Sequence, residues 1–316
     1  SKETSIAYVG EEFTFSHLAA KNYFETSSFV ARSVLKYASQ RRVEDVFEAV
    51  SSGACSYGVV RIESSSVGTV YSIYDLLLKH CDDIAIVGEI GEMEKVCVCA
   101  KARISDVDIT RVYGRSDMLQ ASGEYLNAVD QMRVAANLPM IDRMTSAYPA
   151  TSVANSEVLG AVALCSDTAG IRNGLQQVHP NVSNDRNSQC RYIFIAKMVD
   201  TVLEDPLLVG QLEIQSQRKT SIVVALDNSP GAIFKMSSCF ALRDIGILKI
   251  ESRPAFTALS VEHLSSSVSG MSKRHWDLIF YLDIKPSSVE AVNEAAFRNL
   301  EEFSPWFKVL GTYESR

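Results

Sequence analysis

The sequence lacks the features of membrane proteins and of general nucleic-acid-binding proteins. No stretch reaches the roughly 18 consecutive apolar residues that a membrane-spanning helix needs, and the N-terminal region shows no signal-peptide pattern. Positive charge is not in excess either, because 31 Lys and Arg against 38 Asp and Glu give a formal net charge of −7. Non-specific nucleic-acid binding needs a basic surface, so we expect neither nucleic acid nor membrane as a partner. An anionic ligand would need a local basic pocket.

Cysteine and histidine are too sparse for a metal centre or a disulfide framework. The seven cysteines are odd in number and scattered, and the five histidines are spread along the chain. Only Cys97 and Cys99 are close in sequence, and residues two apart in a strand share one face, here predicted to be buried. We therefore expect reduced thiols, no metal, and an intracellular protein of the cytoplasm or a plastid, with a removed leader compatible with a start at Ser1.

What is present is the composition of a globular α/β protein. Apolar residues make up 47% and charged residues 22% of 316 positions, a length that favours two domains. Short apolar runs alternate with helical patterns over the first two hundred residues, which predicts α/β layering. Strands are expected at 5–9, 57–62, 84–87, 96–100, 161–164 and 190–197, and helices at 15–23, 43–51, 74–80, 118–132 and from 168 onward.

A second pattern follows a polar, weakly periodic segment at 201–219, which we interpret as a linker. The elements predicted beyond it are strand 220–227, helix 233–244, strand 247–252, strand 276–284, helix 287–299 and strand 309–313. A serine-rich connection at 265–272 precedes the third of these strands. The order is βαββαβ, which is the ferredoxin-like topology.

Two motifs stand out in this C-terminal region. They are Asp227-Asn228-Ser229-Pro230-Gly231-Ala232-Ile233-Phe234 and Ile250-Glu251-Ser252-Arg253-Pro254. They resemble the ACT regulatory domain of prephenate and arogenate dehydratases, in which the pair forms a phenylalanine effector site. The resemblance implies that residues 228–233 and 251–254 bind an effector. The physical chemistry agrees, because Gly231 permits close backbone approach and the following helix offers N–H groups to a carboxylate.

The N-terminal two hundred residues carry further motifs of the same family, in the same order. They are Ile6-Ala7-Tyr8-Val9-Gly10, Thr14-Phe15-Ser16-His17-Leu18-Ala19-Ala20, Tyr57-Gly58-Val59-Val60, Ile62-Glu63, Gly68-Thr69-Val70, Tyr74-Asp75-Leu76-Leu77 and Gly88-Glu89. The resemblance implies a periplasmic-binding-protein-like dehydratase domain at 1–200, with subdomain one at about 1–83 and 190–200 and subdomain two at about 84–189. An ACT domain at 220–316 would follow the linker.

Members of this family decarboxylate and dehydrate prephenate to phenylpyruvate, or arogenate to phenylalanine, without a metal or organic cofactor. The resemblance gives this chain Glu63, Ser64, Cys190 and Arg191 as catalytic groups, and Thr14, Ser16 and Tyr192 as substrate contacts. Arg191 would anchor a substrate carboxylate. Phenylalanine would be the effector, and the open edge of an ACT sheet leads us to expect a homodimer or homotetramer.

The sequence departs from the family pattern in the motifs that are expected to form the active site. The Thr-Arg-Phe signature reads Cys190-Arg191-Tyr192, and a thiol is a weaker hydrogen-bond donor than a hydroxyl. The other altered segments are Arg61-Ile62-Glu63-Ser64-Ser65 for a Pro-Ile-Glu-Asn-Ser loop, Gly114-Arg115-Ser116-Asp117 for Ser-His-Pro-Gln, and Glu11-Glu12-Phe13 in the first loop. The effector motifs are nearly intact by contrast.

Two classes of function follow from this contrast. The first is a phenylalanine-regulated prephenate or arogenate dehydratase, with decarboxylation without aromatisation as a variant. The second is a phenylalanine sensor without catalytic activity. Structural readings also stay open: Cys190 as an inert buried thiol, Arg191 as a strand-end ion-pair residue, Glu63 as a solvated carboxylate, and Thr14 as a helix cap.

Overall fold

The structure is a computed structural model that describes residues 2–25, 33–198, 218–227, 229–254 and 278–315. By its contacts the chain divides into two compact units. Unit 1 comprises Ser1–Val70 and Ile90–Tyr192, and unit 2 comprises Tyr71–Glu89 and Ile193–Arg316. The boundaries of these units differ from those of the two domains expected from the sequence, 1–200 and 220–316. Those two domains stay a prediction. The linker at 201–219 and the serine-rich connection lie almost wholly outside the described residues.

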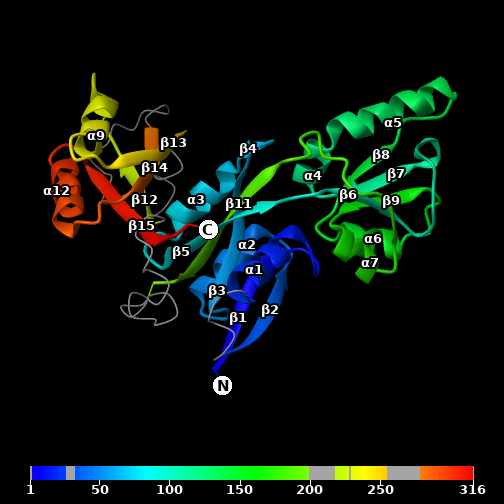
Figure 1. Ribbon diagram of the computed structural model, residues 1–316, viewed down its shortest axis with the longest axis horizontal. Helices are drawn as coiled ribbons and strands as arrows, with labels where there is room; N and C mark the ends of the chain where they lie inside the picture. The colour runs from blue at the N-terminus through cyan, green and yellow to red at the C-terminus, as the bar shows by residue number, and fades with distance from the viewer. Residues whose placement is uncertain (1, 26–32, 199–217, 228, 255–277, 316) are drawn as a thin grey trace. The chain divides into compact units, whose positions relative to one another are not determined.

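The first sheet contains the N-terminal strand of the chain. Its strand order is β2-β1-β3-β11-β5, with β4 paired to β3 (Figure 1). Its strands are β1 (Lys2–Val9), β2 (Ser33–Gln40), β3 (Tyr57–Ser64), β4 (Gly68–Thr69), β5 (Ile84–Met93) and β11 (Gln189–Lys197). Helices α1 (Phe15–Glu25) and α2 (Val43–Ser51) accompany the parallel strands β1, β2 and β3. Strands β5 and β11 each contribute residues to both units.

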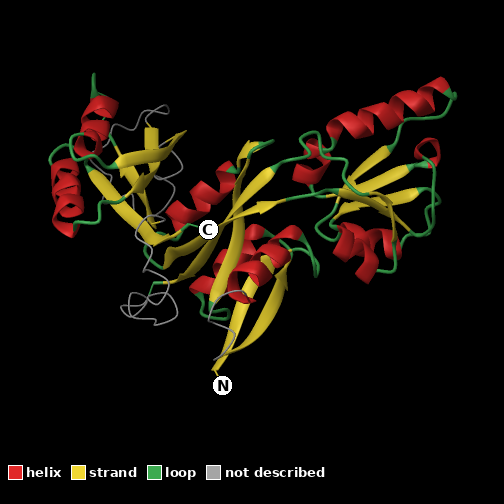
Figure 2. Ribbon diagram, in the orientation of Figure 1, coloured by secondary structure: helices red, strands yellow, loops and turns green. Residues whose placement is uncertain are grey.

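A second sheet of unit 1 has the order β10-β6-β9-β7-β8. Its strands are β6 (Cys97–Ala100), β7 (Arg111–Gly114), β8 (Asp142–Thr145), β9 (Ala161–Cys165) and β10 (Gln176–His179). Figure 2 shows helices on both sides of this sheet: α4 (Ser116–Ala121) and α5 (Gly123–Ala135) on one, α6 (Pro149–Ala154) and α7 (Asp167–Arg172) on the other. Cys97 and Cys99 are buried in the core that this sheet forms with α6 and α7, as their spacing predicted.

The single helix predicted at 118–132 is wrong, because two helices meet at Ser122. Ser122 leaves helical geometry, with φ −111° and ψ 18°, and is completely buried. Gly123 follows it, and serine and glycine are both weaker helix formers than alanine or leucine, so a break costs little there.

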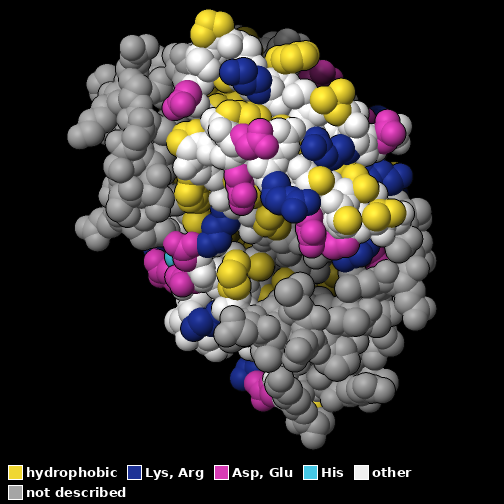
Figure 3. Space-filling model, turned by 90° about the vertical axis from the view of Figure 1, so that its left-hand side faces the viewer, with side chains coloured by type: hydrophobic (Ala, Val, Ile, Leu, Met, Phe, Trp, Pro, Cys, Tyr) yellow, Lys and Arg dark blue, Asp and Glu magenta, His cyan; other side chains and the backbone are white. Residues whose placement is uncertain are grey.

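Unit 2 contains α3 (Tyr71–Lys79) and a four-stranded antiparallel sheet with the order β13-β14-β12-β15. The sheet consists of β12 (Arg218–Ala225), β13 (Gly246–Pro254), β14 (Leu278–Lys285) and β15 (Trp306–Glu314). Helices α9 (Ala232–Ala241) and α12 (Glu290–Glu301) pack on it through a shared apolar core. Gly311 of β15 approaches the backbone of Ile86 so closely that an added Cβ would clash. Figure 3 shows apolar and charged side chains interspersed over one side of the molecule.

Candidate functional site

Two neighbouring strands, β3 and β11, carry the residues predicted to be catalytic. Cys190 and Tyr192 alternate with Arg191 along β11, so they share one face, and they are 2% and 0% exposed. Ser64, at the end of β3, is buried, its hydroxyl lies 2.9 Å from that of Ser66, and it acts on the pKa of the neighbouring Cys190 thiol. The structure therefore brings Ser64, Cys190 and Tyr192 together.

Arg61 is the centre of a polar network beside this group. Its Nη1 lies 3.4 Å from Glu94 Oε2 and 3.9 Å from Cys190 Sγ. Its Nη2 lies 2.5 Å from Oδ2 of Asp117. Arg115 binds the same carboxylate through two contacts, Nη2 to Oδ2 at 2.7 Å and Nε to Oδ1 at 3.2 Å. Three of the segments that depart from the family pattern thus meet in one place.

The charges of the network set the protonation of its members. Burial alone would raise the pKa of the Asp117 carboxyl, but Arg115 and Arg61 outweigh burial and lower it to about 2. Burial, reinforced by Glu94, raises the pKa of the Cys190 thiol to about 12, although Arg61 acts in the opposite direction. Cys190 is therefore a neutral thiol near pH 7, which makes it a weak hydrogen-bond donor and a poor nucleophile.

Arg191 and Glu63 form an ion pair of their own, with Nε and Oε1 2.7 Å apart. Their side chains are 12% and 28% exposed. Because side chains alternate along a strand, Arg191 points away from the face that holds Cys190 and Tyr192. The predicted carboxylate anchor is thus paired with a carboxylate of the chain itself.

Thr14 and Ser16, the predicted substrate contacts near α1, are both buried at 3% exposure. Thr14 does not act as the side-chain cap that the sequence suggests. Its Oγ1 instead donates a hydrogen bond to the carbonyl oxygen of Val9 at 3.3 Å, while its own carbonyl accepts the amide of Leu18 in the first helical turn. This contact fastens the start of α1 to the end of β1.

Glu11, in the altered first loop, links the two sheets of unit 1. Its carboxylate accepts hydrogen bonds from the backbone N–H groups of Ala150 and Thr151, at 2.8 and 2.9 Å, and from the Thr151 hydroxyl at 2.5 Å. Helix α6 begins at Pro149, so these N–H groups have no partner within the helix. The Glu11 carboxylate accepts hydrogen bonds from them, and its negative charge interacts favourably with the positive end of the helix dipole.

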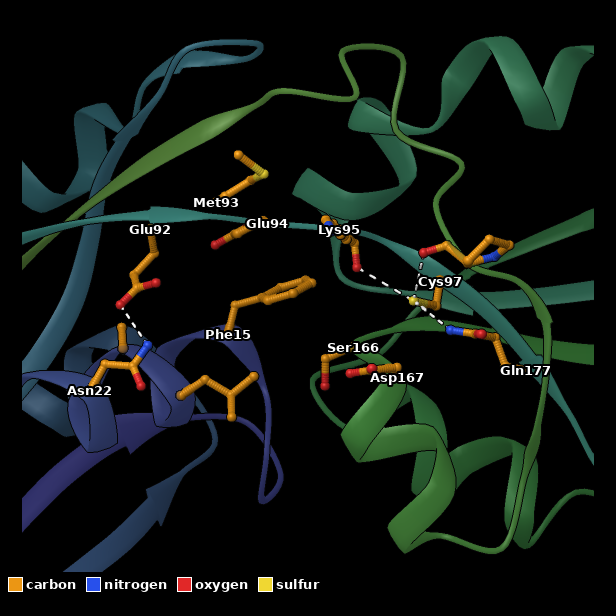
Figure 4. A pocket seen from close by; sticks show the side chains of 13 residues that line it. Phe15, Asn22, Glu92, Met93, Glu94, Lys95, Cys97, Ser166, Asp167 and Gln177 are labelled. Atoms are coloured by element: carbon orange, nitrogen blue, oxygen red, sulfur yellow. Dashed lines mark hydrogen bonds between the residues drawn. The ribbon is translucent and has the colours of Figure 1, made fainter. Parts of the chain in front are cut away.

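A cavity of about 450 Å³ lies beside this network within unit 1 (Figure 4). It is lined by Phe15, Leu18, Ala19, Asn22, Glu92, Met93, Glu94, Lys95, Cys97, Ser166, Asp167, Gln177 and Pro180. Glu94 joins the cavity to the network, because it also accepts the Tyr192 hydroxyl and pairs with Arg61. The lining contains none of the predicted catalytic or substrate-contact residues, and Tyr192 is joined to it through its hydrogen bond to Glu94.

A second cavity, of about 210 Å³, lies at the start of α9 in unit 2. Its lining consists of Leu226, Asp227, Ser229, Gly231, Ala232, Ile233, Phe234, Leu278 and Phe280. Most of the first predicted effector motif is therefore at this cavity, while Asn228 lies outside the described residues. Gly231 adopts φ 80°, a left-handed conformation that glycine takes at no steric cost.

The second effector motif lies on β13, which pairs with β14 so that Ser252 is opposite Phe280 and Pro254 is opposite Leu278, two residues that line that cavity. Arg253 makes a two-point ion pair with Asp75 of α3, at 3.1 and 2.7 Å, and its guanidinium covers the ring of Tyr71. Glu251 pairs with Lys249 at 3.0 Å. The cavity lining includes none of residues 251–254, although the strand that carries them lies next to it.

No cluster of three or more His, Cys, Asp or Glu side chains suited to a metal occurs among the described residues. A helix both long and apolar enough to span a membrane is likewise missing from the described part of the chain.

Comparison with known proteins places this geometry in a family. The family model described as prephenate dehydratase matches residues 6–199. The chain is 29% identical, over 98% of its length and 72% of the relative's, to arogenate dehydratase/prephenate dehydratase 2 of Arabidopsis thaliana. It is 27% identical to the bifunctional chorismate mutase/prephenate dehydratase of Escherichia coli K12, over 98% of this chain and 70% of that one.

Solved structures show the same fold at lower identity. Prephenate dehydratase from Arthrobacter aurescens, in complex with L-Phe, matches with a TM-score of 0.73 and 19% identity over 98% of this chain and 90% of that one. GqqA, described as a novel type of quorum quenching acylase, matches with a TM-score of 0.69 and 18% identity over 99% and 98%. The family match, which covers more than half of the chain, shows that the chain belongs to the prephenate dehydratase family.

Proposed function

We propose that this protein is a dehydratase that acts on prephenate or arogenate. The observation that carries the proposal is the cavity of about 450 Å³, which Glu94 joins to Tyr192 and Arg61 and thereby to Cys190. Its volume lies within the range of pockets that bind small organic molecules such as prephenate or arogenate. The relatives, which include an arogenate dehydratase/prephenate dehydratase, agree with this substrate class.

For this reaction the protein mainly has to position the substrate, because the chemistry is driven by aromatisation of the ring. The bond between the ring and its carboxylate breaks, the bonding electrons enter the ring, and the hydroxyl on the opposite carbon leaves with a proton as water. Aromatisation drives these steps, so the protein must hold the ring and help the hydroxyl leave. In this proposal Ser64 and the Cys190 thiol provide polar contacts for the departing oxygen, and the Arg191–Glu63 pair borders the site.

Regulation by phenylalanine is the second part of the proposal. We assign residues 220–316 to a ferredoxin-like ACT domain whose cavity at α9 admits the effector. The lining of this cavity includes no residue of the second motif, and we infer that two copies pair so that Glu251–Pro254 of one complete the cavity of the other. Strand β13 is an edge strand of its sheet and is suited to such pairing. The L-Phe complex of the Arthrobacter relative agrees with this ligand.

The experiment is an assay of the purified protein with prephenate and with arogenate, each with and without phenylalanine. We expect phenylpyruvate or phenylalanine to form and the rate to change with the effector. Release of carbon dioxide without an aromatic product would instead indicate decarboxylation alone, in which the ring hydroxyl stays. Absence of both products at high enzyme concentration would remove the dehydratase proposal.

A second candidate is a phenylalanine sensor without turnover. The ion pairs that Arg61 and Arg115 form with Asp117 favour it, because they occupy positions where the family carries uncharged motif residues. This candidate predicts that phenylalanine binds, by calorimetry, although neither substrate reacts. Loss of binding at millimolar phenylalanine would exclude it.

A further inference from the structure

Two arginines that the family pattern does not contain lie buried side by side in unit 1. Arg61 and Arg115 are 11% and 16% exposed in their side chains. Both donate to Oδ2 of Asp117, at 2.5 and 2.7 Å, so a single oxygen atom joins the two guanidinium groups. They come from β3 and from the residue that precedes α4, so only the folded chain brings them together.

Each guanidinium keeps a buried N–H group without a partner. Among the described residues, Arg61 Nε and Arg115 Nη1 have no hydrogen-bond acceptor, although both atoms are shielded from solvent. A buried N–H that stays unsatisfied is costly, and here the group is also charged. Two such groups on neighbouring arginines are suited to the two oxygens of a carboxylate.

We propose that Arg61 and Arg115 bind the side-chain carboxylate of the substrate, the one that belongs to its 2-oxo or 2-amino acid. This assignment rests on the proposed function and extends it to residues of this chain. Arg61 joins this pair to the proposed site, because its Nη1 contacts Cys190 Sγ at 3.9 Å and pairs with Glu94 of the cavity.

The ring carboxylate is the wrong partner for this pair. Its negative charge disappears as carbon dioxide leaves, so cations that bind it tightly stabilise the substrate more than the transition state and slow the reaction. The side-chain carboxylate keeps its charge throughout and is retained in the product. Binding it anchors the substrate without opposing the chemistry.

Asp117 is the internal competitor for this site. Its carboxylate already holds one edge of Arg115 and one nitrogen of Arg61, and the low pKa of about 2 keeps it ionised at neutral pH. A ligand must therefore use the remaining N–H groups or displace Asp117. Removing the Asp117 charge should make the arginines more attractive to an anion.

The test uses phenylpyruvate as the probe, because it carries the side-chain carboxylate and needs no turnover. Calorimetry on the full chain compares the wild type with Arg115→Gln, Asp117→Asn and Arg191→Gln. Arg111→Gln is the matched control, since Arg111 forms an exposed ion pair with Asp142 elsewhere in unit 1. Thermal melting of every variant verifies that it is folded.

We expect Arg115→Gln to weaken phenylpyruvate binding about tenfold to a hundredfold, Asp117→Asn to tighten it, Arg191→Gln to weaken it less than Arg115→Gln does, and Arg111→Gln to leave it nearly unchanged. Opposite shifts in two folded variants exclude a purely structural role. The inference is overturned if the wild type does not bind phenylpyruvate at 10 mM, if Arg115→Gln binds normally, or if Arg191→Gln abolishes binding. Failure of turnover with Arg115-dependent binding intact would remove only the dehydratase proposal.

Discussion

His17 should make the stability of this protein fall as the pH drops from 7 to 5. The imidazole is 4% exposed and stacks on Tyr8, with ring centroids 4.6 Å apart. The backbone N–H of Phe13 donates to its Nδ1 at 2.8 Å. A proton on Nδ1 would remove that acceptor, so the folded protein favours the neutral ring. Burial, helped by the charge of Lys21, lowers the pKa of His17 from 6.5 to about 4.

The magnitude follows from this difference. Above pH 7 the ring is neutral in both the folded and the unfolded chain, so it contributes nothing to the pH dependence. Below pH 6.5 the unfolded chain gains a proton that the folded protein rejects, and the folded state loses stability until the pH reaches about 4. Between pH 7.5 and pH 5 the expected loss in the free energy of unfolding is about 2 kcal/mol.

Urea unfolding at pH 7.5, 6 and 5 measures this loss. His17→Asn is the comparison, because its side-chain oxygen can still accept the Phe13 amide but does not titrate in this range. The variant should be less stable at every pH, since it leaves a cavity, yet its stability should fall about 2 kcal/mol less than that of the wild type. Equal pH slopes for the two proteins would refute the reasoning.

Three further outcomes are expected. Cys190→Thr should raise the rate of product formation roughly tenfold by restoring a hydroxyl donor, whereas Cys190→Ala should not, and equal rates in steady-state assays would contradict the role of this position. Glu11→Ala should lower the free energy of unfolding by about 2–4 kcal/mol in urea titrations, because it orphans buried N–H groups at the start of α6; a loss below about 1 kcal/mol would contradict this. Arg253→Gln should weaken phenylalanine binding about tenfold in calorimetry, while Asp75→Asn, which frees the guanidinium, should not; the reverse order would exclude Arg253 as an effector contact.

Local patterns predicted most of the helices and strands that bury one apolar face. The helix at 43–51 has the bounds that the sequence predicted, and β9 and β11 differ by a residue. Elements without a clear apolar period were missed, among them β2 at the edge of the first sheet and β8, whose four residues are all exposed. An edge strand buries little, so its sequence carries little periodicity.

The residues of the candidate site were likewise predicted only in part from the sequence. The resemblance to the family motifs predicted Cys190 and Ser64 as site residues, and the structure places them close together. It did not identify Glu94, because a single acidic residue between two predicted strands is typical of a solvated loop. Arg61 and Asp117 were recognised only as departures from a pattern, and nothing in the sequence joined them.

By itself the sequence determined the family and the βα patterning of the chain, because these depend on residues close together and on motif order. The tertiary structure alone decided which charges pair. Arg61, Glu94 and Asp117 come from separate segments of unit 1, and they meet because the sheet places β11 between β3 and β5 and because α4 follows β7. Ion pairs between distant segments depend on distance in space, and no local pattern encodes that distance.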